Sequence, residues 1–177
     1  MTADSAELRN LDLRGERVIG VDLEAPEITD ARFEDCDLSG IVLTSATIRR
    51  ATVRRTRIRD CVFGGAMVQD TTIEECPTER LVLRFATLQR VTFTGCRLTG
   101  ADFYGTTFEK VVIENCDLST AHFDSCTVKE LTVRRCDMLG LTGALSLKGA
   151  HVDLDDLAAL APSLAREAGL LFTVDDT

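Results

Sequence analysis

The sequence contains no tryptophan, one tyrosine and two histidines among its 177 residues. Few aromatic side chains leave no platform for stacking nucleic-acid bases. A net charge of −9 and a pI of about 4.7 argue further against direct binding to nucleic acid. Neither His122 nor His151 has a partner at a spacing typical of a nucleophile or a metal site. We therefore expect no catalytic residues and no bound metal.

Long apolar runs and phosphate-binding loops are also missing. No run of about 18 apolar residues could span a bilayer, and residues 1–10 lack the apolar region of a signal peptide. The glycines do not follow the pattern of a P-loop or a dinucleotide-binding loop. These absences predict a cytoplasmic protein that needs no cofactor and does not bind membranes.

What the sequence does contain is a five-residue repeat. Of the 27 positions from Leu8 to Met138 in steps of five, 26 are Leu, Ile, Val, Phe or Met, and only Thr78 departs. A track of smaller residues, rich in alanine, precedes these positions by two. A period of five fits neither a helix nor a strand and indicates a solenoid. Residues two apart on an extended segment share a side, so both tracks can face inward.

The pattern resembles that of the pentapeptide-repeat family, for example in Ala101–Gly105 (Ala-Asp-Phe-Tyr-Gly) and Cys116–Thr120 (Cys-Asp-Leu-Ser-Thr). The resemblance covers roughly residues 6–140. It implies an all-β fold, a right-handed quadrilateral β-helix with about twenty residues per coil and about seven coils. The β-helix is expected at 1–148 and a short C-terminal helical cap at 149–177.

Outward charges support a coil of twenty residues independently. Residues twenty apart would stack at about 4.8 Å, where opposite charges attract. Like-charge pairs such as Asp117 with Asp137 also occur, so the rule is a tendency. The sets that alternate in sign are Asp30, Arg50, Asp70 and Arg90; Glu34, Arg54 and Glu74; Asp35, Arg55 and Glu75; Asp37 and Arg57; Asp60 and Arg80; and Glu109 and Lys129.

All the cysteines lie on the small track, where disulfides, a metal site and simple packing are the three conceivable roles. An odd count without an export signal argues against a disulfide framework, although stacked residues would be within bridging range. Four of the thiols would line one wall over roughly 14 Å and could not converge on zinc. We expect reduced cysteines that act as small apolar residues. They are Cys36, Cys61, Cys76, Cys96, Cys116, Cys126 and Cys136.

Two segments depart from the pattern. Pro77 and Thr78 replace regular repeat residues, which predicts a kink or local irregularity about halfway along the solenoid. A tolerated irregularity is the favoured interpretation, and a binding notch is the alternative. Near the C-terminus, Asp153 is the expected N-cap of a helix that Pro162 should kink or restart and that Gly169 should end.

The tail also resembles the C-terminal segments of MfpA-like pentapeptide-repeat proteins, in which this end carries the dimer contact. The resemblance implies a homodimer joined tail to tail. The expected dimer-interface residues are Leu154, Leu157, Leu160, Leu164, Leu170, Leu171 and Phe172.

Function is expected to come from the outer surface, since the interior should have no room for a ligand. Resemblance to MfpA and Qnr proteins implies a non-catalytic DNA mimic that modulates DNA gyrase or another type II topoisomerase and gives fluoroquinolone resistance. The alternative is a structural or scaffold module whose acidity serves only solubility, because a band of arginines follows the first acids. The candidate acidic partner surface consists of Asp22, Glu24, Glu27, Asp153, Asp155 and Asp156.

Overall fold

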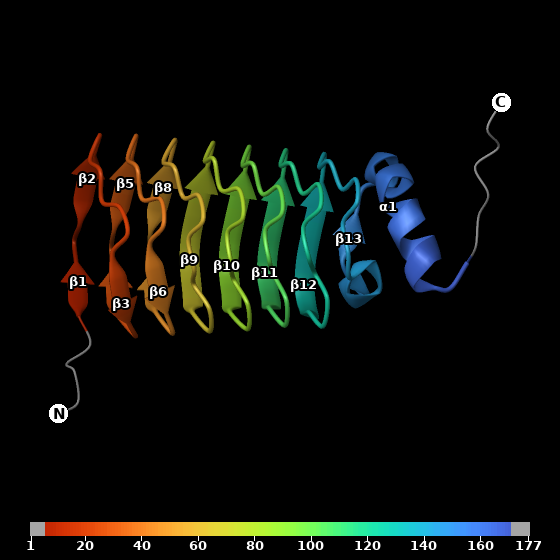
Figure 1. Cartoon of the computed structure of the whole chain (residues 1–177), viewed down its shortest axis with the longest axis horizontal. Helices are drawn as coiled ribbons and strands as arrows, with labels where there is room; N and C mark the ends of the chain where they lie inside the picture. The colour runs from red at the N-terminus through yellow and green to blue at the C-terminus, as the bar shows by residue number, and fades with distance from the viewer. Residues whose placement is uncertain (1–5, 171–177) are drawn as a thin grey trace.

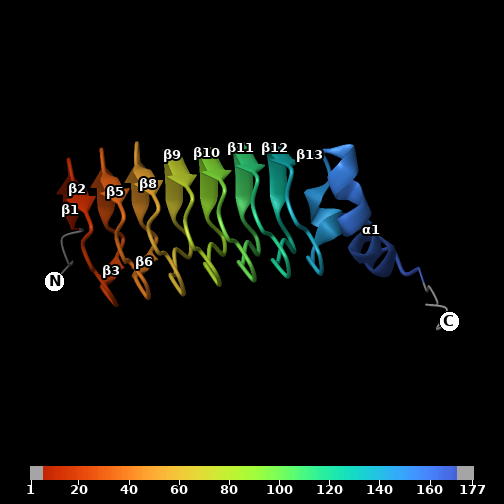
Figure 2. The same ribbon diagram turned by 90° about the horizontal axis from the view of Figure 1, so that it is seen from above.

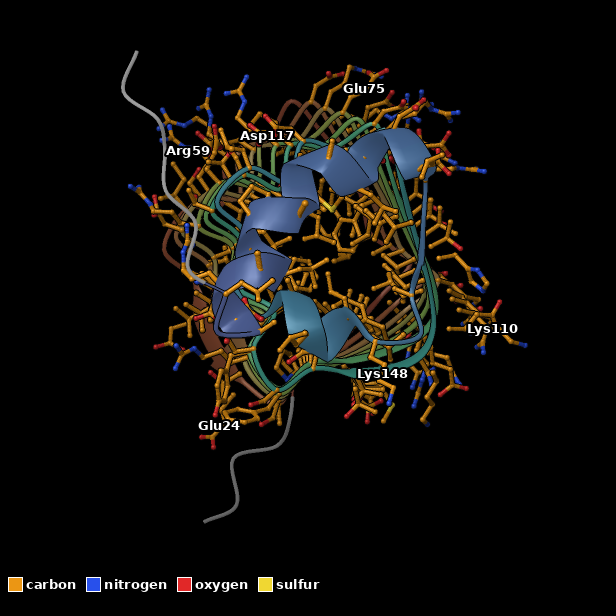
Figure 3. All side chains as sticks on the ribbon, turned by 90° about the vertical axis from the view of Figure 1, so that its right-hand side faces the viewer. Glu24, Arg59, Glu75, Lys110, Asp117 and Lys148 are labelled. Carbon is orange, nitrogen blue, oxygen red and sulfur yellow. The ribbon has the colours of Figure 1, made fainter. Side chains whose placement is uncertain are left out.

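The computed structural model describes residues 6–170, which form a rod of stacked coils capped at one end by a helix (Figures 1 and 2). The chain advances about one coil for every twenty residues, and strands of successive coils pair in parallel. Leu8 pairs with Ile28, and Leu88 pairs with Phe108. The predicted four-sided solenoid of about seven coils is therefore confirmed, and Figure 3, viewed along its axis, shows the square outline.

The strands are short in the first coils and longer in the later ones. The short strands are β1 (Glu7–Arg9), β2 (Asp12–Arg14), β3 (Asp22–Glu24), β4 (Glu27–Thr29), β5 (Arg32–Glu34), β6 (Val42–Thr44), β7 (Thr47–Arg49) and β8 (Thr52–Arg54). The longer strands, each running along two sides of the rod, are β9 (Met67–Glu74), β10 (Thr87–Thr94), β11 (Thr107–Glu114) and β12 (Thr127–Arg134). The last elements are the 3₁₀ helix η1 (Ala144–Leu147), β13 (His151–Val152) and α1 (Leu154–Glu167).

We number the four faces by their first central residue. The first face contains the pentapeptides centred on Leu8 and every twentieth residue after it, the second those from Leu13, the third those from Val18, and the fourth those from Leu23. The fourth face thus comprises residues 21–25, 41–45, 61–65, 81–85, 101–105, 121–125 and 141–145.

At the corners between faces the backbone takes a left-handed conformation. Gly20 has φ +65°, but charged residues such as Asp30 (φ 57°) and Arg50 (φ 53°) adopt it too. A positive φ at every fifth residue turns the chain from one face to the next. Glu130 occupies a corner position without a positive φ, and there β12 slips in register against β11. The irregular backbone angle and the shift in strand register therefore occur at the same residue.

The interior is packed most densely in the later coils. Phe103 stacks on Phe123 with ring centroids 4.7 Å apart, and Phe108 lies 5.7 Å from Phe103 and 5.9 Å from Phe123. All three rings are fully buried. Such aromatic pairs add to the stability given by apolar burial alone.

In the earlier coils the interior is not filled. A cavity of about 260 Å³ runs from Leu8 to Phe93, lined by side chains of all four faces. The expectation that the interior has no room is therefore wrong. The central track there carries mainly aliphatic residues such as Val53 and Val68, with a few phenylalanines such as Phe33.

The cysteines occupy the small inward track as expected. Stacking of adjacent coils is direct at Cys96, whose backbone N–H donates to Sγ of Cys116 at 3.3 Å. All seven thiols are free, and only Cys126 is not fully buried. Burial raises the pKa of Cys61 to about 11 and that of Cys126 to about 12. Both thiols therefore stay protonated at neutral pH and are poor nucleophiles.

The break at Pro77 does not interrupt the coil, which agrees with a tolerated local irregularity. Pro77 pairs with Arg97 of the next coil, and its carbonyl accepts a hydrogen bond from Ile58 N–H at 2.9 Å. Thr78 is fully buried and donates through Oγ1 to the Arg97 carbonyl at 2.9 Å. Proline removes one backbone donor, and the surrounding ladder tolerates that single loss.

The C-terminal end of the rod is covered by η1 and α1. Leu160 is 3% exposed and packs on the core together with Leu164. Glu167 accepts hydrogen bonds from the N–H groups of Gly143 and Ala144 at 2.7 and 3.0 Å, which fastens the end of α1 to η1. Covering the last coil shields its edge and its core from solvent.

The helix itself follows the sequence prediction in part. It starts after Asp153, as expected, although this side chain makes no capping hydrogen bond. It ends just before Gly169, which has φ +78°. Pro162 lies inside the helix and does not restart it, because the helix is one continuous element from Leu154 to Glu167.

Candidate interaction surfaces

Ion-pair ladders run along the outside of the rod, both at the left-handed corners and on the faces between them. Arg50 binds Asp30 through two hydrogen bonds of 2.6 and 2.8 Å. Asp60 with Arg80 and Asp70 with Arg90 pair in the same way, which confirms these predicted pairs. The predicted contacts of Asp37 with Arg57 and of Glu109 with Lys129 are also present.

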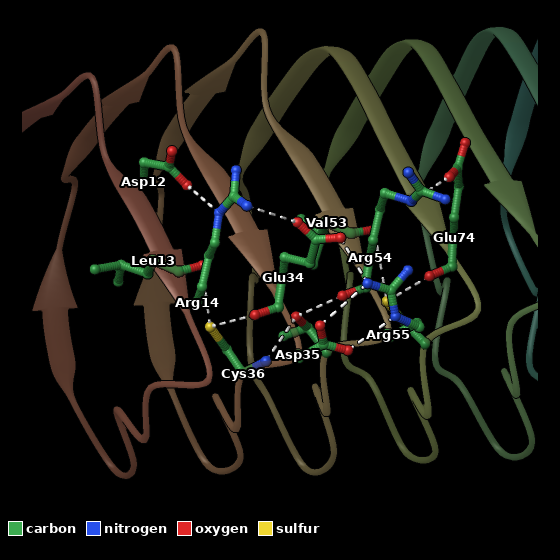
Figure 4. A network of polar contacts seen from close by, with 12 residues as sticks. Asp12, Leu13, Arg14, Glu34, Asp35, Cys36, Val53, Arg54, Arg55 and Glu74 are labelled. Carbon is green, nitrogen blue, oxygen red and sulfur yellow. Dashed lines mark hydrogen bonds and ion pairs between the residues drawn. The ribbon is translucent and has the colours of Figure 1, made fainter.

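One predicted ladder is rearranged (Figure 4). Arg54 binds Glu74 at 2.9 Å, but Glu34 pairs instead with Arg55 at 2.6 Å. Arg55 also reaches Asp35 at 2.8 Å, so one guanidinium serves two carboxylates of the preceding coil. The sign rule thus predicts that neighbouring coils pair, but it does not predict which of two adjacent residues forms the pair.

These pairs predict a loss of stability in acid. Hydrogen bonds from Arg50 and Arg90 lower the pKa of Asp30 and Asp70, respectively. A carboxyl whose pKa is lower in the folded state stabilises that state above its unfolded value of about 3.9, and the contribution disappears as pH falls through the folded pKa. We expect the urea midpoint to be steady from about pH 7 to 5 and to drop below about pH 4.

Urea unfolding across this pH range measures the effect. Asp30→Asn with Asp70→Asn should make the acid slope shallower, while the same changes at Asp22 and Asp12, which lack such bidentate arginine contacts in the described chain, should not. An unchanged slope in the first double variant would contradict the assignment. High salt should weaken the pairs because they are exposed.

The fourth face differs from the other three in charge. Its only basic residue is Arg84, and its acids are Asp22, Glu24, Asp102 and Asp124. Arg84 pairs with Asp102, so this face retains a negative charge. On the first and second faces, by contrast, acids and bases are equal in number. The fourth face therefore has the fewest charged residues but the largest net charge of the four faces.

The same face carries an apolar ladder. Val42, Val62 and Val82 lie over one another in successive coils and remain half-buried. The corresponding outward positions of the second face are mostly threonine, and those of the third are mostly charged. Valine at an outward position offers β-branched packing surface rather than hydrogen bonds.

An aromatic cluster follows the valines. Phe85 is 63% exposed, and its ring meets the ring of Tyr104 edge to face at 5.5 Å. The Arg84 guanidinium lies 5.4 Å from the centre of the Tyr104 ring. Phe85 covers Gly105, where a Cβ would lie 2.6 Å from the Phe85 ring. We call Arg84, Phe85 and Tyr104 the aromatic cluster.

Phe85 is also unusual in its backbone. It sits at a corner with φ 58°, and every other non-glycine residue with positive φ in the described chain is polar, charged or alanine. A bulky residue in this conformation is a departure from the normal backbone preferences. The signal is visible in the sequence, because Phe85 is the one aromatic residue on the corner track.

The candidate acids lie in two groups at opposite ends of the rod (Figure 1). Asp22 and Glu24 are exposed on β3, and their partners in β6 are Val42 and Thr44, which carry no positive charge. Glu27 is half-buried on β4. At the other end Asp153 and Asp155 are exposed. Asp156 accepts a hydrogen bond from Cys136 N–H at 3.1 Å and so has a structural role.

The candidate dimer residues fall into an exposed group and a group that faces the core. Leu154 is 81% exposed and Leu157 is 37% exposed, and Leu170 is also largely exposed. Leu160 and Leu164 face the core of their own chain. Leu171 and Phe172 lie outside the described residues. Exposed apolar side chains therefore remain on the cap at both ends of α1, with Leu154 and Leu157 at its start and Leu170 after its end.

Within residues 6–170 no three His, Cys, Asp or Glu side chains converge as metal ligands would. Nδ1 of His122 lies 2.9 Å from Thr142 Oγ1, and His151 lies in β13. A search of the described helices finds none of the length and apolarity that a bilayer crossing requires.

Comparison with protein families agrees with the geometry. A model described as pentapeptide repeats in nine copies matches residues 88–137, and one of eight copies matches residues 27–65. Together these segments span half of the chain. The chain belongs to the pentapeptide-repeat family. It has no match among curated proteins.

Solved structures of other pentapeptide-repeat proteins are similar in fold. Rfr23 from the cyanobacterium Cyanothece 51142 is 13% identical with a TM-score of 0.50, over 77% of this chain and 91% of that one. A trypsin-treated form of QnrB1, described as a plasmid-mediated fluoroquinolone resistance protein, is 16% identical with a TM-score of 0.44, over 96% and 100%. At 13% identity, the comparison with Rfr23 shows the fold alone.

Proposed function

We propose that this pentapeptide-repeat protein is a non-catalytic binding protein, a rigid rod that docks onto another protein through its fourth face. The observation that carries the proposal is the aromatic cluster. Exposed Phe85 and Tyr104 beside Arg84 form the kind of group that dominates protein interfaces, where tyrosine and arginine are enriched.

The other faces support the choice by contrast. Most of their charged side chains already pair between coils, as Asp60 and Arg80 do. Burying such an ion pair against a partner costs free energy of desolvation, whereas burying valine or phenylalanine is favourable. Of the four faces, the fourth therefore buries most easily against a partner.

Site-specific photo-cross-linking tests the proposal. With p-benzoylphenylalanine at Phe85, we expect a discrete cross-linked product with a second protein in the native cells. The matched control places the same residue at Lys110, a corner of the first face with similar φ (56°). Cross-linking that is equal at both positions, or absent at both, would reject docking through the fourth face.

A second candidate is a DNA-mimicking modulator of DNA gyrase or another type II topoisomerase, working as a tail-to-tail homodimer. It is favoured by the exposed apolar side chains of Leu154, Leu157 and Leu170. Joining two tails there would bring Asp153 and Asp155 of both chains to the centre of a longer rod. The first two faces have equal numbers of acids and bases and so lack the excess negative charge of a DNA mimic, which favours the docking rod instead.

Gyrase supercoiling with and without a fluoroquinolone separates the two candidates. Mimicry predicts inhibition or protection, a dimer mass by light scattering, and loss of both in Leu154→Glu. A monomer mass with unchanged supercoiling would eliminate this candidate and leave the docking rod.

A further inference from the structure

The cavity inside the first coils has the chemistry of a hydrocarbon site. Of its lining residues only Thr71 and Thr78 carry a polar side-chain atom. Their hydroxyls donate to backbone carbonyls, of Gln69 and Arg97 respectively, both at 2.9 Å. Neither hydroxyl therefore has a proton left to donate to a ligand. A cavity without a polar partner does not hold ordered water, since a buried water needs two to four such partners.

The size of the cavity is sufficient for a molecule. Apolar cavities of roughly 150 Å³ bind benzene or xenon, and this one has a volume of about 260 Å³. Its lining comes from five successive coils, from Leu8 to Leu88 along the first face alone. Coils stack about 4.8 Å apart, so the space is long and narrow. A compact ring system fits such a shape less well than a single chain.

The cavity is closed at one end and open at the other. Toward α1, the stacked rings of Phe103, Phe108 and Phe123 fill the axis. At the first coil, lining residues such as Leu8 and Leu23 are only half-buried, whereas Ile28 and Leu43 in the next coil are buried. Within the described residues, the first coil therefore forms a mouth.

We propose that this cavity binds one unbranched hydrocarbon chain, which enters through the first coil and leaves its polar head group outside. The wall supplies only apolar contacts, so recognition depends on the length and width of the chain. This site is independent of the docking surface on the fourth face. Free fatty acids and neutral long-chain lipids share this chemistry, and the head group distinguishes them.

Fluorescence of cis-parinaric acid, an unbranched fatty acid that emits when shielded from water, measures binding to the full-length protein. We expect emission to rise on mixing. Dodecanoic acid and dodecan-1-ol should displace it, and the stronger of the two identifies a carboxylate or a neutral head group. Adamantane-1-carboxylic acid, which is compact and branched, should not displace it.

Filling the cavity provides the decisive variant. Val53 lines it and pairs in register with Phe33, so Val53→Phe should occupy the axis without a new kind of contact. Binding should weaken by roughly tenfold or more, which corresponds to about 1.4 kcal/mol. Val68→Phe serves as a second filling variant in case the first fails to fold. Val133→Phe, a buried position outside the cavity, should bind like the parent protein.

Circular dichroism confirms that each variant is folded. Emission that does not rise with the parent protein would overturn the proposal. So would binding that survives in both filling variants, because the probe would then occupy an outer surface such as the aromatic cluster. Displacement by the adamantane acid would overturn the unbranched shape.

Discussion

Gly143→Ala should detach the C-terminal cap from the solenoid. Gly143 has φ +76°, and a Cβ there would lie 2.2 Å from the backbone nitrogen of Asp124 and 2.3 Å from the carbonyl carbon of Phe123. Both neighbours are backbone, so neither can move aside without breaking the coil. Gly143 N–H also donates to Glu167, so displacing this residue breaks the link to α1. We expect a loss of at least about 3 kcal/mol in the free energy of unfolding.

Urea unfolding measures the total loss, and hydrogen exchange of residues 141–170 shows where it occurs. Gly20→Ala is the matched control, because Gly20 has φ +65° but a Cβ added there would meet no atom within 4 Å. Its cost should be about 1 kcal/mol, the usual penalty of a left-handed alanine. Ala25 already occupies such a corner with φ 49°. Equal losses in the two variants would show that conformation, rather than collision, limits Gly143.

Most of the fold can be predicted from the five-residue repeat in the sequence. A pairing between Asp60 and Arg80 can be predicted because both residues point outward at the same corner of adjacent coils. The left-handed corners could not be read in the same way, since residues as different as Asp30 and Arg50 adopt them. There the closed geometry of the coil overrides the preference of the single residue.

The surfaces are harder to predict, because packing decides which side chains remain exposed. Leu154 and Leu160 belong to one apolar pattern, yet α1 turns Leu160 into the core and leaves Leu154 outside. The cavity depends likewise on how far each inward side chain reaches toward the axis. Phe85 could have been singled out, because an aromatic residue on a polar track is visible without any structure.

Phe103→Ala should cause one of the largest losses of stability in the rod. The ring is fully buried and stacks on Phe123 at 4.7 Å, so its removal leaves a cavity in the best-packed coils. Truncations of this kind cost about 3–5 kcal/mol. Phe33→Ala makes the same chemical change beside the existing cavity, where Phe33 is only half-buried. Its cost should be about half as large, because fewer contacts are lost.

Thermal and urea unfolding of the two variants measure this difference. Each coil of a solenoid contacts only its neighbours, so hydrogen exchange should show the effect of Phe33→Ala confined to the first coils. Loss of Phe103 should instead expose the later coils, since its ring packs on Phe108 and Phe123 of the following coil. Equal losses would mean that the first coils are packed as tightly as the later ones. The cavity would then be filled in solution, and the hydrocarbon site would fail with it.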